Sequence, residues 1–511
     1  MNYPDRLKLI YLESEHPEYT ASKDLYVQLT HLTQGGVLLE QNKERYLPKR
    51  AGETDEIYKT RLNKFTYTNV TSSALTQQVT KLSSGAYTIN GLEANQSFWT
   101  SFREDVNCNG LSELQLLQKL FRDALVYKKL FVHVDKPRTT VQPRNKLEEE
   151  RLNIRPYLTI YSACEVIDWV ENNNALQMVK VKQFSQHRET LLSPPIDKVT
   201  YTIITAEMIL RYSALVRLVK GKIVALLDTE GKELSLVDED TSIQIDYPPI
   251  LHRFGTLPVF KFELPDELWA GNQIYLKAKE HLVLDNVRFD MASMAYVQRI
   301  LTPQITPESD LTQTYTEGET ILSGNPFILK AADFKFAELK GDVLNTLTSL
   351  LADLEAQVKD TLSLGGMSAD KRAIEQSGVS KKLDFALQEL VLRSYGSLLL
   401  DFYQNVLQAV GKATGQSNES VSSISASGFT SFDLDNADEL IVKALDLLRL
   451  QNFLTPTTFR LFAQQLNRAL VPNASAEEQA LIDKDLESKS LELSASSLNP
   501  ELLTVSTTAD T

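Results

Sequence analysis

The 511-residue sequence predicts an α+β fold, in which helical and strand-rich regions occupy different parts of the chain. Three patterns support this fold class. Residues 1–130 carry mostly helical patterns, residues 130–250 change to strand patterns, and three long helical patterns follow between Asn272 and Val410. The long helices are too extended for an ordinary enzyme core, so they are the first indication of function.

Turn-rich breaks, such as Gly35-Gly36 and residues 107–110, separate the amino-terminal helices. These helices are expected at residues 24–32, 55–65, 69–82 and 111–127. From Leu130 onward the pattern is typical of strands, with the clearest alternation at residues 180–184. Strands are expected at residues 130–134, 157–161, 178–184, 198–205, 209–218 and 223–227. The charged, proline-containing residues 136–153 indicate an exposed loop.

The first long helix is expected at residues 272–302, which contain neither Gly nor Pro and allow a rod of about 45 Å. Pro303 then stops it, and residues 303–340 contain short strand patterns. The second helix begins after Gly341 and carries apolar residues at alternating spacings of three and four. This seam consists of Leu344, Leu347, Leu351, Leu354 and Val358. Because leucines at such spacing usually form core, we assign the seam to packing.

The second helix is expected to end at Gly365 and Gly366, a pair that adopts backbone conformations other residues avoid. Two adjacent cations, Lys371 and Arg372, follow this hinge. The segment is either an ordinary helix connection or a loop projecting from a rigid scaffold. In the second case the cations would touch phosphates without reading bases. A third long helix is expected at residues 379–410.

The third helix has one weak point, Gly396, and leads into residues 411–431. That stretch is rich in Ser, Gly and Asn, which indicates a flexible connection. Three short helices are then expected, at residues 436–450, 456–470 and 476–487. The Ser/Thr-rich residues 488–511 contain no aromatic side chain and predict a flexible tail.

The formal net charge of -14 argues against a protein that coats nucleic acid, because tight DNA binders neutralise phosphates with clustered cations. The same negative charge is compatible with a channel lined by carboxylates, which repel DNA and so let it slide. No apolar run approaches the roughly eighteen residues of a membrane span, and the amino terminus lacks a signal-peptide apolar segment. We therefore expect a protein made in a cytoplasm. Cys108 and Cys164 fit a reducing compartment, although one bridge between them stays open.

The sequence contains no recognisable catalytic constellation. It has no G-x-x-x-x-G-K-[ST] loop, no H-E-x-x-H and no G-x-S-x-G. The six histidines are scattered singly, and two separated cysteines do not make a zinc site. The acidic residues 238–240 are expected in a solvated turn, and Asp353 with Glu355 is expected to form a polar helix face beside the leucine seam. The sequence therefore predicts no enzyme, no cofactor and no metal site.

The order of these parts and several local motifs make the chain resemble the portal proteins of tailed bacteriophages. The motifs are Tyr46-Leu47-Pro48 followed by Gly52-Glu53, Tyr58 and Arg61-Leu62; Val134-Asp135-Lys136-Pro137; Arg155-Pro156-Tyr157-Leu158 with Asp168-Trp169; and Ser377-Gly378-Val379 before Leu383 and Phe385. The resemblance spans nearly the whole chain. It implies a mixed α/β wing, two stem helices around a small β-containing clip, a tunnel loop, a long wing helix and a helical crown.

The resemblance implies the following division of the chain: a wing at 1–265, helical over 1–130 and strand-rich over 130–250; stem helices at 266–302 and 342–364; a clip at 303–341; a tunnel loop at 365–376; a long wing helix at 377–413; a linker at 414–435; a crown at 436–488; and a flexible tail at 489–511. On this reading the hinge is Gly365 with Gly366, and Lys371 and Arg372 contact DNA in the channel.

The family forms a ring, commonly of twelve subunits, at one vertex of the capsid. DNA enters through it during packaging and leaves during infection. The resemblance therefore implies a virion protein assembled in the host cytoplasm, with no membrane partner. Its implied partners are other copies of itself, the major capsid protein, the terminase packaging motor, a head-to-tail adaptor and double-stranded DNA without sequence preference. A portal is not itself the ATPase, which agrees with the missing phosphate loop.

Two other interpretations stay open. One is another virion structural protein or head-to-tail adaptor, although adaptors are usually much shorter than 511 residues. The other is a hydrolase with an unrecognised site within residues 130–250. It would need a converging acid, base or metal set, and none can be assembled from this sequence.

Overall fold

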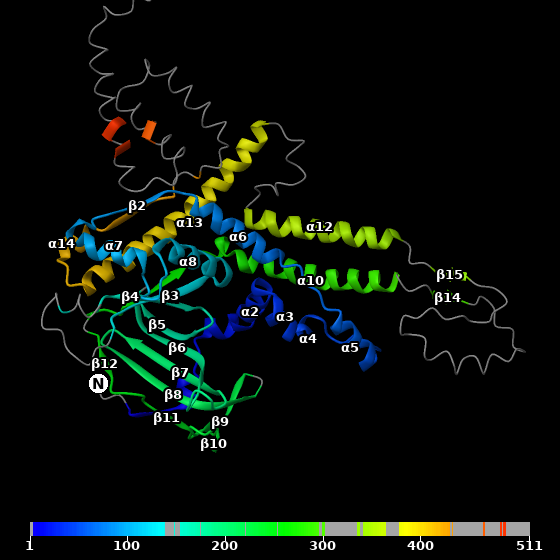
Figure 1. The fold of residues 1–511 in the computed structure, drawn as a ribbon, viewed down its shortest axis with the longest axis horizontal. Helices are drawn as coiled ribbons and strands as arrows, with labels where there is room; N and C mark the ends of the chain where they lie inside the picture. Colours follow the sequence, from blue (N-terminus) through cyan, green and yellow to red (C-terminus); the bar gives the residue numbers. More distant parts are fainter. Residues whose placement is uncertain are drawn as a thin grey trace, which may run out of the picture. The chain divides into compact units, whose positions relative to one another are not determined.

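The computed structural model describes residues 4–137, 148, 154–173, 175–219, 221–252, 254–295, 299–301, 335–337, 341–363, 378–429, 432, 463–464, 481–482 and 484–486. The chain forms two compact units, Met1–Thr430 and Ser431–Thr511. The first unit combines helices with antiparallel sheets, which confirms the predicted α+β class (Figure 1).

The amino-terminal region before β3 is mostly helical. Its helices are α1 (Leu9–Leu12), α2 (Pro17–Gln34), α3 (Gly36–Gln41), α4 (Lys43–Tyr46), α5 (Asp55–Asn63), α6 (Val70–Ser83), η1 (Glu93–Asn95), α7 (Gln96–Glu104) and α8 (Glu113–Tyr127). The four expected helices are confirmed as α2, α5, α6 and α8. Side-chain oxygens of Thr54, Asn69 and Ser112 accept backbone N–H bonds at the starts of α5, α6 and α8, which explains where these helices begin.

Two antiparallel sheets follow. The strands of the first, in the order β13-β3-β4, are β13 (Val259–Glu263), β3 (Lys129–Asp135) and β4 (Tyr157–Ser162). The strands of the second are β10 (Glu233–Leu236), β9 (Lys222–Leu227), β8 (Met208–Val219), β7 (Ile196–Thr205), β6 (Ala175–His187) and β5 (Val166–Asn172), with β12 (Ile250–Leu251) also pairing β8. The six expected strands are confirmed, whereas β5, β10, β12 and β13 of these two sheets were not predicted from the sequence.

The amino-terminal residues 6–14, here called the strap, cover one face of the large sheet. Strand β1 (Arg6–Lys8) pairs with β11 (Ser242–Gln244), and α1 follows directly. Lys180 of β6 is 3% exposed, and its ammonium donates to Ser14 Oγ at 2.6 Å and pairs with Asp168 at 3.1 Å. Because the strap covers this face, Lys180 and its neighbour Val181 are both buried, although they point to opposite sides of the sheet.

Two long antiparallel helices, here called the helix hairpin, leave the sheet region side by side (Figure 1). The turn η2 (Asp266–Leu268) leads into α10 (Ala270–Ala295), and α12 (Gly341–Ser363) returns. The predicted extension of the first helix to Thr302 is wrong. Residues Arg299–Leu301 form β14, which pairs with β15 (Lys335–Ala337), because backbone groups at the far end of the hairpin bond between strands instead of along a helix.

The third long helix, α13 (Gly378–Ala413), packs against β3, β13 and β16. The predicted flexible linker is wrong over the residues that form α14 (Asn418–Ser422) and β16 (Ser425–Gly428). Ser417 caps α14, and β16 pairs with β2 (Tyr87–Asn90), a partner too distant in sequence to anticipate. Phe429 is then 2% exposed against α13 at Gly396, where an added Cβ would overlap the phenylalanine Cβ.

Several expected parts lie outside the described residues. They are the tunnel loop at 365–376, most of the clip, most of the crown at 436–488 and the tail at 489–511; within the crown, residues 463–464, 481–482 and 484–486 are helical. In the part of the chain that the structure does describe, none of the helices combines the length and the apolar character needed to cross a bilayer.

The contact between Gly396 and Phe429 gives a stability prediction. Gly396→Ala should lower the free energy of unfolding by about 1–3 kcal/mol, because the new methyl group overpacks against a buried ring. Urea denaturation measures this as a lower midpoint at unchanged slope. Gly411→Ala in the same helix is the control, since its nearest neighbour is a movable Val421 methyl at 3.2 Å. Equal effects of the two variants would contradict the packing account.

Candidate functional site

Helix α12 buries its predicted seam. Leu351, Leu354 and Val358 are 7%, 4% and 0% exposed, while Leu344 and Leu347 are half-buried. The helix packs against α10 along its length and also against α6. Burial therefore decreases from the end near the body toward the end near β15, where α10 is the main cover.

The exposed side of α12 divides into two flanks. The uncharged flank carries the exposed side chains Asn345, Thr348, Ser349 and Ala352. The acidic flank carries Val343, Leu350 and Asp353, of which the two apolar side chains are 47% and 39% exposed. At 3.6 residues per turn, the two flanks lie about 140° apart around the helix.

Cations are missing from the exposed side of α12 over residues 342–362. The one lysine there, Lys359, is half-buried and pairs with Glu355 at 2.8 Å. The Thr348 hydroxyl donates to the Leu344 carbonyl at 2.8 Å, so this proton is not available to a phosphate. Without a cation, the uncharged flank lacks the charge that usually holds a phosphate backbone.

Helix α10 is buried on several sides and carries buried polar groups. Asn286 accepts from the Thr66 N–H at 3.0 Å and donates to the Thr66 carbonyl at 2.8 Å. Asp285 pairs with Arg288 at 2.7 Å and accepts from the Thr68 hydroxyl at 3.3 Å. These bonds hold the segment before α6 against the helix, and they fix the position of the helix hairpin relative to the amino-terminal helices.

The start of the helix hairpin is also tied to the body. The Trp269 indole N–H donates to the Val126 carbonyl at 3.0 Å, and the Tyr395 hydroxyl donates to the Leu268 carbonyl at 2.8 Å. Gly271 lies so close to the Val126 carbonyl that an added Cβ would overlap it. The hairpin is therefore held by α8 and α13 at one end.

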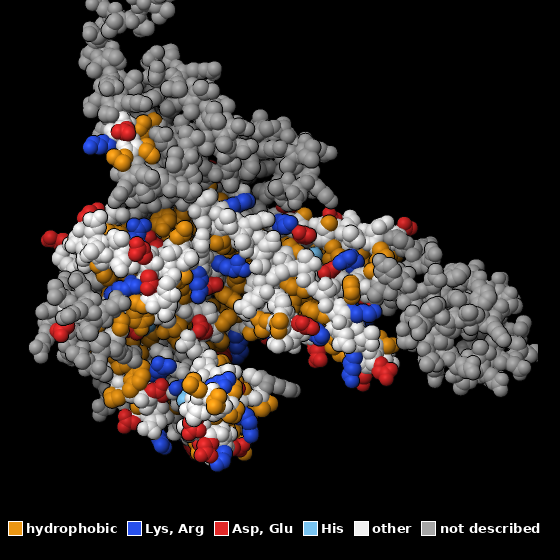
Figure 2. All heavy atoms as spheres, viewed as in Figure 1, with side chains coloured by type: hydrophobic (Ala, Val, Ile, Leu, Met, Phe, Trp, Pro, Cys, Tyr) orange, Lys and Arg blue, Asp and Glu red, His pale blue; other side chains and the backbone are white. Residues whose placement is uncertain are grey.

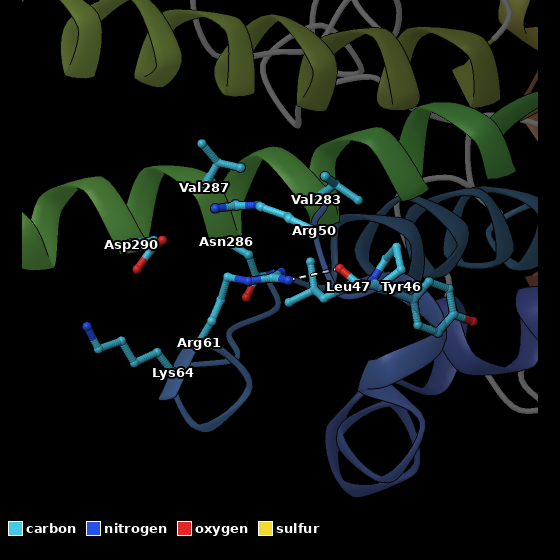
Figure 3. A pocket seen from close by; sticks show the side chains of 10 residues that line it. Tyr46, Leu47, Arg50, Arg61, Lys64, Val283, Asn286, Val287 and Asp290 are labelled. Atoms are coloured by element: carbon cyan, nitrogen blue, oxygen red, sulfur yellow. Dashed lines mark hydrogen bonds between the residues drawn. The ribbon is translucent and has the colours of Figure 1, made fainter. Parts of the chain in front are cut away.

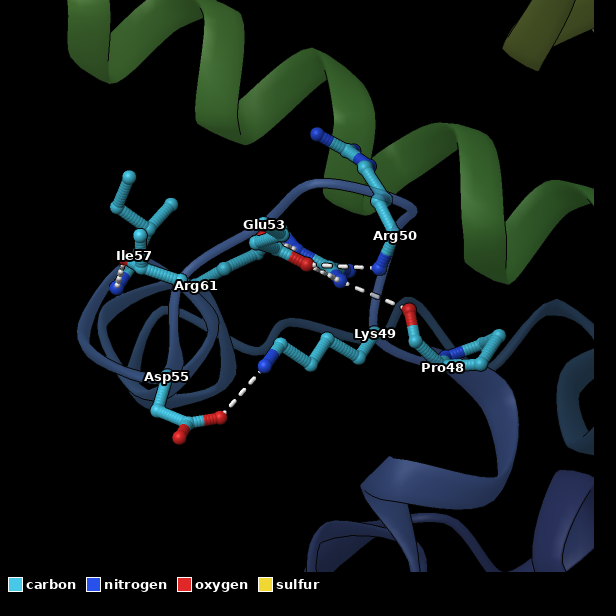
Figure 4. A network of polar contacts seen from close by, with 8 residues as sticks. Pro48, Lys49, Arg50, Glu53, Asp55, Ile57 and Arg61 are labelled. Carbon is cyan, nitrogen blue, oxygen red and sulfur yellow. Dashed lines mark hydrogen bonds and ion pairs between the residues drawn. The ribbon is translucent and has the colours of Figure 1, made fainter.

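The first motif behind the resemblance folds around Arg61 (Figure 4). The Arg61 guanidinium makes two 2.8 Å bonds to the Glu53 carboxylate and donates to the Pro48 carbonyl at 2.9 Å. Glu53 also accepts from the Arg50 N–H at 2.9 Å. The charged side chains are 8% and 6% exposed, and Arg61 lies 5.3 Å from the centre of the Tyr58 ring. These bonds lower the pKa of Glu53 to about 2.

A cavity of about 190 Å³ lies between this loop and α10 and is here called the hairpin cavity (Figure 3). Its lining residues are Tyr46, Leu47, Pro48, Arg50, Arg61, Lys64, Val283, Asn286, Val287 and Asp290. Figure 3 shows Arg50 lying alongside Val283 and Val287 of α10. The cavity therefore combines apolar walls with the cationic side chains of Arg50, Arg61 and Lys64 and one carboxylate, that of Asp290. It was not predicted from the sequence.

Both parts of another motif behind the resemblance, residues 155–158 with residues 168–169, also have structural roles. Arg155 pairs with Asp105 at 2.8 Å and joins the loop before α8 to the start of β4. Trp169 stacks on His16 with ring centres 3.9 Å apart, and the Lys129 ammonium lies 4.4 Å from its ring. These residues connect the amino-terminal segment to the sheets.

The predicted DNA-contact residues Lys371 and Arg372, and the hinge Gly365 with Gly366, lie outside the described residues. Cys108 is exposed and Cys164 half-buried, and both are free thiols, so the bridge that the sequence left open is not formed. Burial raises the pKa of the Cys164 thiol to about 11. Among the residues with described positions, no group of three His, Cys, Asp or Glu side chains is arranged to hold a metal ion.

No family model matches the chain, and no curated protein matches it. A similar solved structure comes from "Virion of native gene transfer agent (GTA) particle", with 11% identity and a TM-score of 0.32 over 84% of this chain and 94% of that one. Another comes from "Neck of empty GTA particle computed with C6 symmetry", with 12% identity and a TM-score of 0.31 over 78% and 90% of the two chains. Values this low carry no argument about function.

The Glu53–Arg61 pair gives a pH prediction. The folded-state pKa of Glu53, about 2, lies below the ordinary value of 4.5. Its stabilisation is therefore complete above pH 4.5 and is lost as the pH falls toward 2. The deficit in unfolding free energy of Glu53→Gln should shrink between pH 6 and pH 3, as measured by urea denaturation.

Arg61→Ala provides the control for this pH dependence. In the Arg61→Ala chain, the loss of unfolding free energy caused by Glu53→Gln should depend much less on pH. The reason is that the charge that lowers the pKa of Glu53 is absent. A deficit of Glu53→Gln in the otherwise native chain that is constant from pH 6 to pH 3 would contradict the assigned pairing.

Proposed function

We propose that this chain is the portal subunit of a tailed-phage-like particle, which assembles into a ring around a channel for double-stranded DNA. The observation that carries the proposal is the helix hairpin. It is tied to the body at one end, it buries the predicted seam of α12, and it leaves an exposed side of α12 without a cation. The sequence resemblance supplies the class of protein.

The helix hairpin favours a ring because several apolar side chains on its outer sides are exposed within the described part of the chain. Leu276 of α10 is 61% exposed, and Val343 and Leu350 of α12 are also exposed. On the face in Figure 2, apolar and charged side chains are interspersed among other atoms along the described part of the hairpin. Identical neighbours related by rotation would bury such side chains around a closed ring.

The overall negative charge favours a channel through which DNA moves, rather than a surface that binds DNA tightly. Twelve copies of a chain with formal net charge -14 would carry about -170 charges before counterions. With the uncharged flank of α12 toward the channel, DNA would meet small polar side chains in a strongly negative field. A polyanion in such a channel is repelled from all sides and slides without reading of sequence.

The remaining assignments follow the same proposal. The wing faces the capsid protein, the clip meets the terminase motor and later the adaptor, and the protein resides at the portal vertex of the virion. Lys371 and Arg372, next to the hinge Gly365-Gly366, make weak and replaceable contacts to phosphates.

Replacement of Lys371 and Arg372 together with alanine tests the tunnel-loop assignment. Packaging or retention of DNA should change while the ring still assembles, because the two cations are assigned to DNA and not to subunit contacts. Particle assembly followed by measurement of protected DNA gives both readouts. Unchanged packaging would count against the assignment.

A gain-of-binding experiment tests the uncharged flank. Asn345→Lys with Ser349→Lys adds two cations per subunit, one turn apart on this flank. The assembled variant should acquire duplex binding that falls steeply with salt, whereas the native ring should show little binding at about 0.15 M salt. Fluorescence anisotropy with a duplex fragment measures this.

The neutral pair Asn345→Gln with Ser349→Thr is the control and should behave like the native ring. Strong, salt-sensitive DNA binding by the native ring would contradict the proposed passage. So would a lysine variant that forms rings without any gain in binding.

A further inference from the structure

We infer that the hairpin cavity is the docking site for a second copy of this chain. In this contact, Leu350 on α12 of one copy enters the cavity of the next copy, and Asp353 meets Arg50 at its rim. The inference rests on the proposed function, and it names the contact by which one subunit holds its neighbour in the ring.

The size of the cavity fits a side chain better than a free ligand. Small-molecule pockets usually enclose about 300–1,000 Å³, whereas this cavity encloses about 190 Å³. An apolar cavity of about 150 Å³ is enough to hold a benzene molecule. With Leu47, Val283 and Val287 among its walls, the hairpin cavity suits one aliphatic side chain.

The charges at the cavity favour an acidic partner. Arg61 is held by Glu53 in the network of Figure 4, but the Arg50 guanidinium forms no ion pair within the part of the chain that is described. Arg50 is an exposed residue and lines the cavity. A carboxylate brought to this rim would gain a charge-assisted bond from a guanidinium that forms no ion pair with the described residues of its own copy.

The acidic flank of α12 offers the matching pair. Leu350 is 39% exposed, and Asp353 is exposed three residues later. Side chains at this spacing are neighbours on a helix surface, so an apolar group and a carboxylate can reach the same site together. The flank lies about 140° from the uncharged flank, which leaves the latter free to face a channel.

The arrangement also sets the type of assembly. The cavity is built from α10 and the loop around Arg61, whereas Leu350 and Asp353 belong to α12. Contacts between two different surfaces run head to tail and close into a ring when the rotation between copies permits. The motif at residues 46–62 is then explained by a binding surface as well as by folding.

Charge exchange in the full-length chain tests the contact. Arg50→Glu and Asp353→Arg should each raise the protein concentration at half-assembly by roughly tenfold or more, as followed by mass photometry. The two substitutions combined should restore assembly toward the native level, because the opposite charges meet again in reversed order.

Lys49→Glu is the matched control. Lys49 neighbours Arg50 in sequence but pairs with Asp55 at 2.6 Å and does not line the cavity. This substitution should leave assembly close to native. Circular dichroism of each variant separates loss of assembly from loss of folding.

The outcomes distinguish the contact from the ring itself. If the native chain stays monomeric at all concentrations, both this inference and the proposed function are wrong. If rings form and Arg50→Glu behaves like Lys49→Glu, or the combined variant gives no rescue, the inference is wrong and the ring stands. If Arg50→Glu rings form normally but no longer hold capsid protein, the occupant is another protein and the inference is again wrong.

Discussion

The packing of α12 on α10 is the interaction on which the rest of this structure depends. Val358 and Leu354 are buried at the end of α12 near the body, while Leu344 near β15 is only half-buried. Two helices that leave a body together can bury one stripe between them, and their outer sides stay exposed. This constraint explains why apolar side chains remain exposed along the described part of the helix hairpin, where the proposed function places further copies of the chain.

Buried polar groups give the helix hairpin a defined position. Asn286 and Asp285 bind the segment before α6, while Trp269 binds the end of α8. Bonds of this kind contribute modest net stability, but removal of one partner leaves a buried group unsatisfied. The position of the hairpin is therefore specified by geometry as much as by apolar burial. The Arg61 network extends this control to the wall of the hairpin cavity.

The sequence predicted the parts whose signals are local. Periodicity located α12, α13 and six strands, because a buried stripe repeats at the helical or strand period. It did not predict β14 or β16, since each depends on a partner strand far along the chain. The burial of Lys180 was equally hidden, because alternation in one strand does not reveal that the strap around Ser14 covers the second face.

Only part of the candidate site could be predicted from the sequence. The leucine seam was visible from its spacing, but the hairpin cavity requires residues 46–64 to meet residues 283–290. In the sequence, the motif at residues 46–62 carries part of the resemblance, but it does not indicate that these residues meet α10. The opposite flanks of α12 could have been read from its periodicity, since a helix with one apolar seam must place its remaining residues on other faces.

The central claim is that the uncharged flank of α12 lines a channel in a ring. Cryo-electron microscopy of the purified full-length protein tests it most directly. The account predicts a closed ring with a central channel, in which Asn345, Thr348, Ser349 and Ala352 face the opening and the seam faces α10. A compact monomer, or a ring in which this flank faces outward or is buried between subunits, would contradict it.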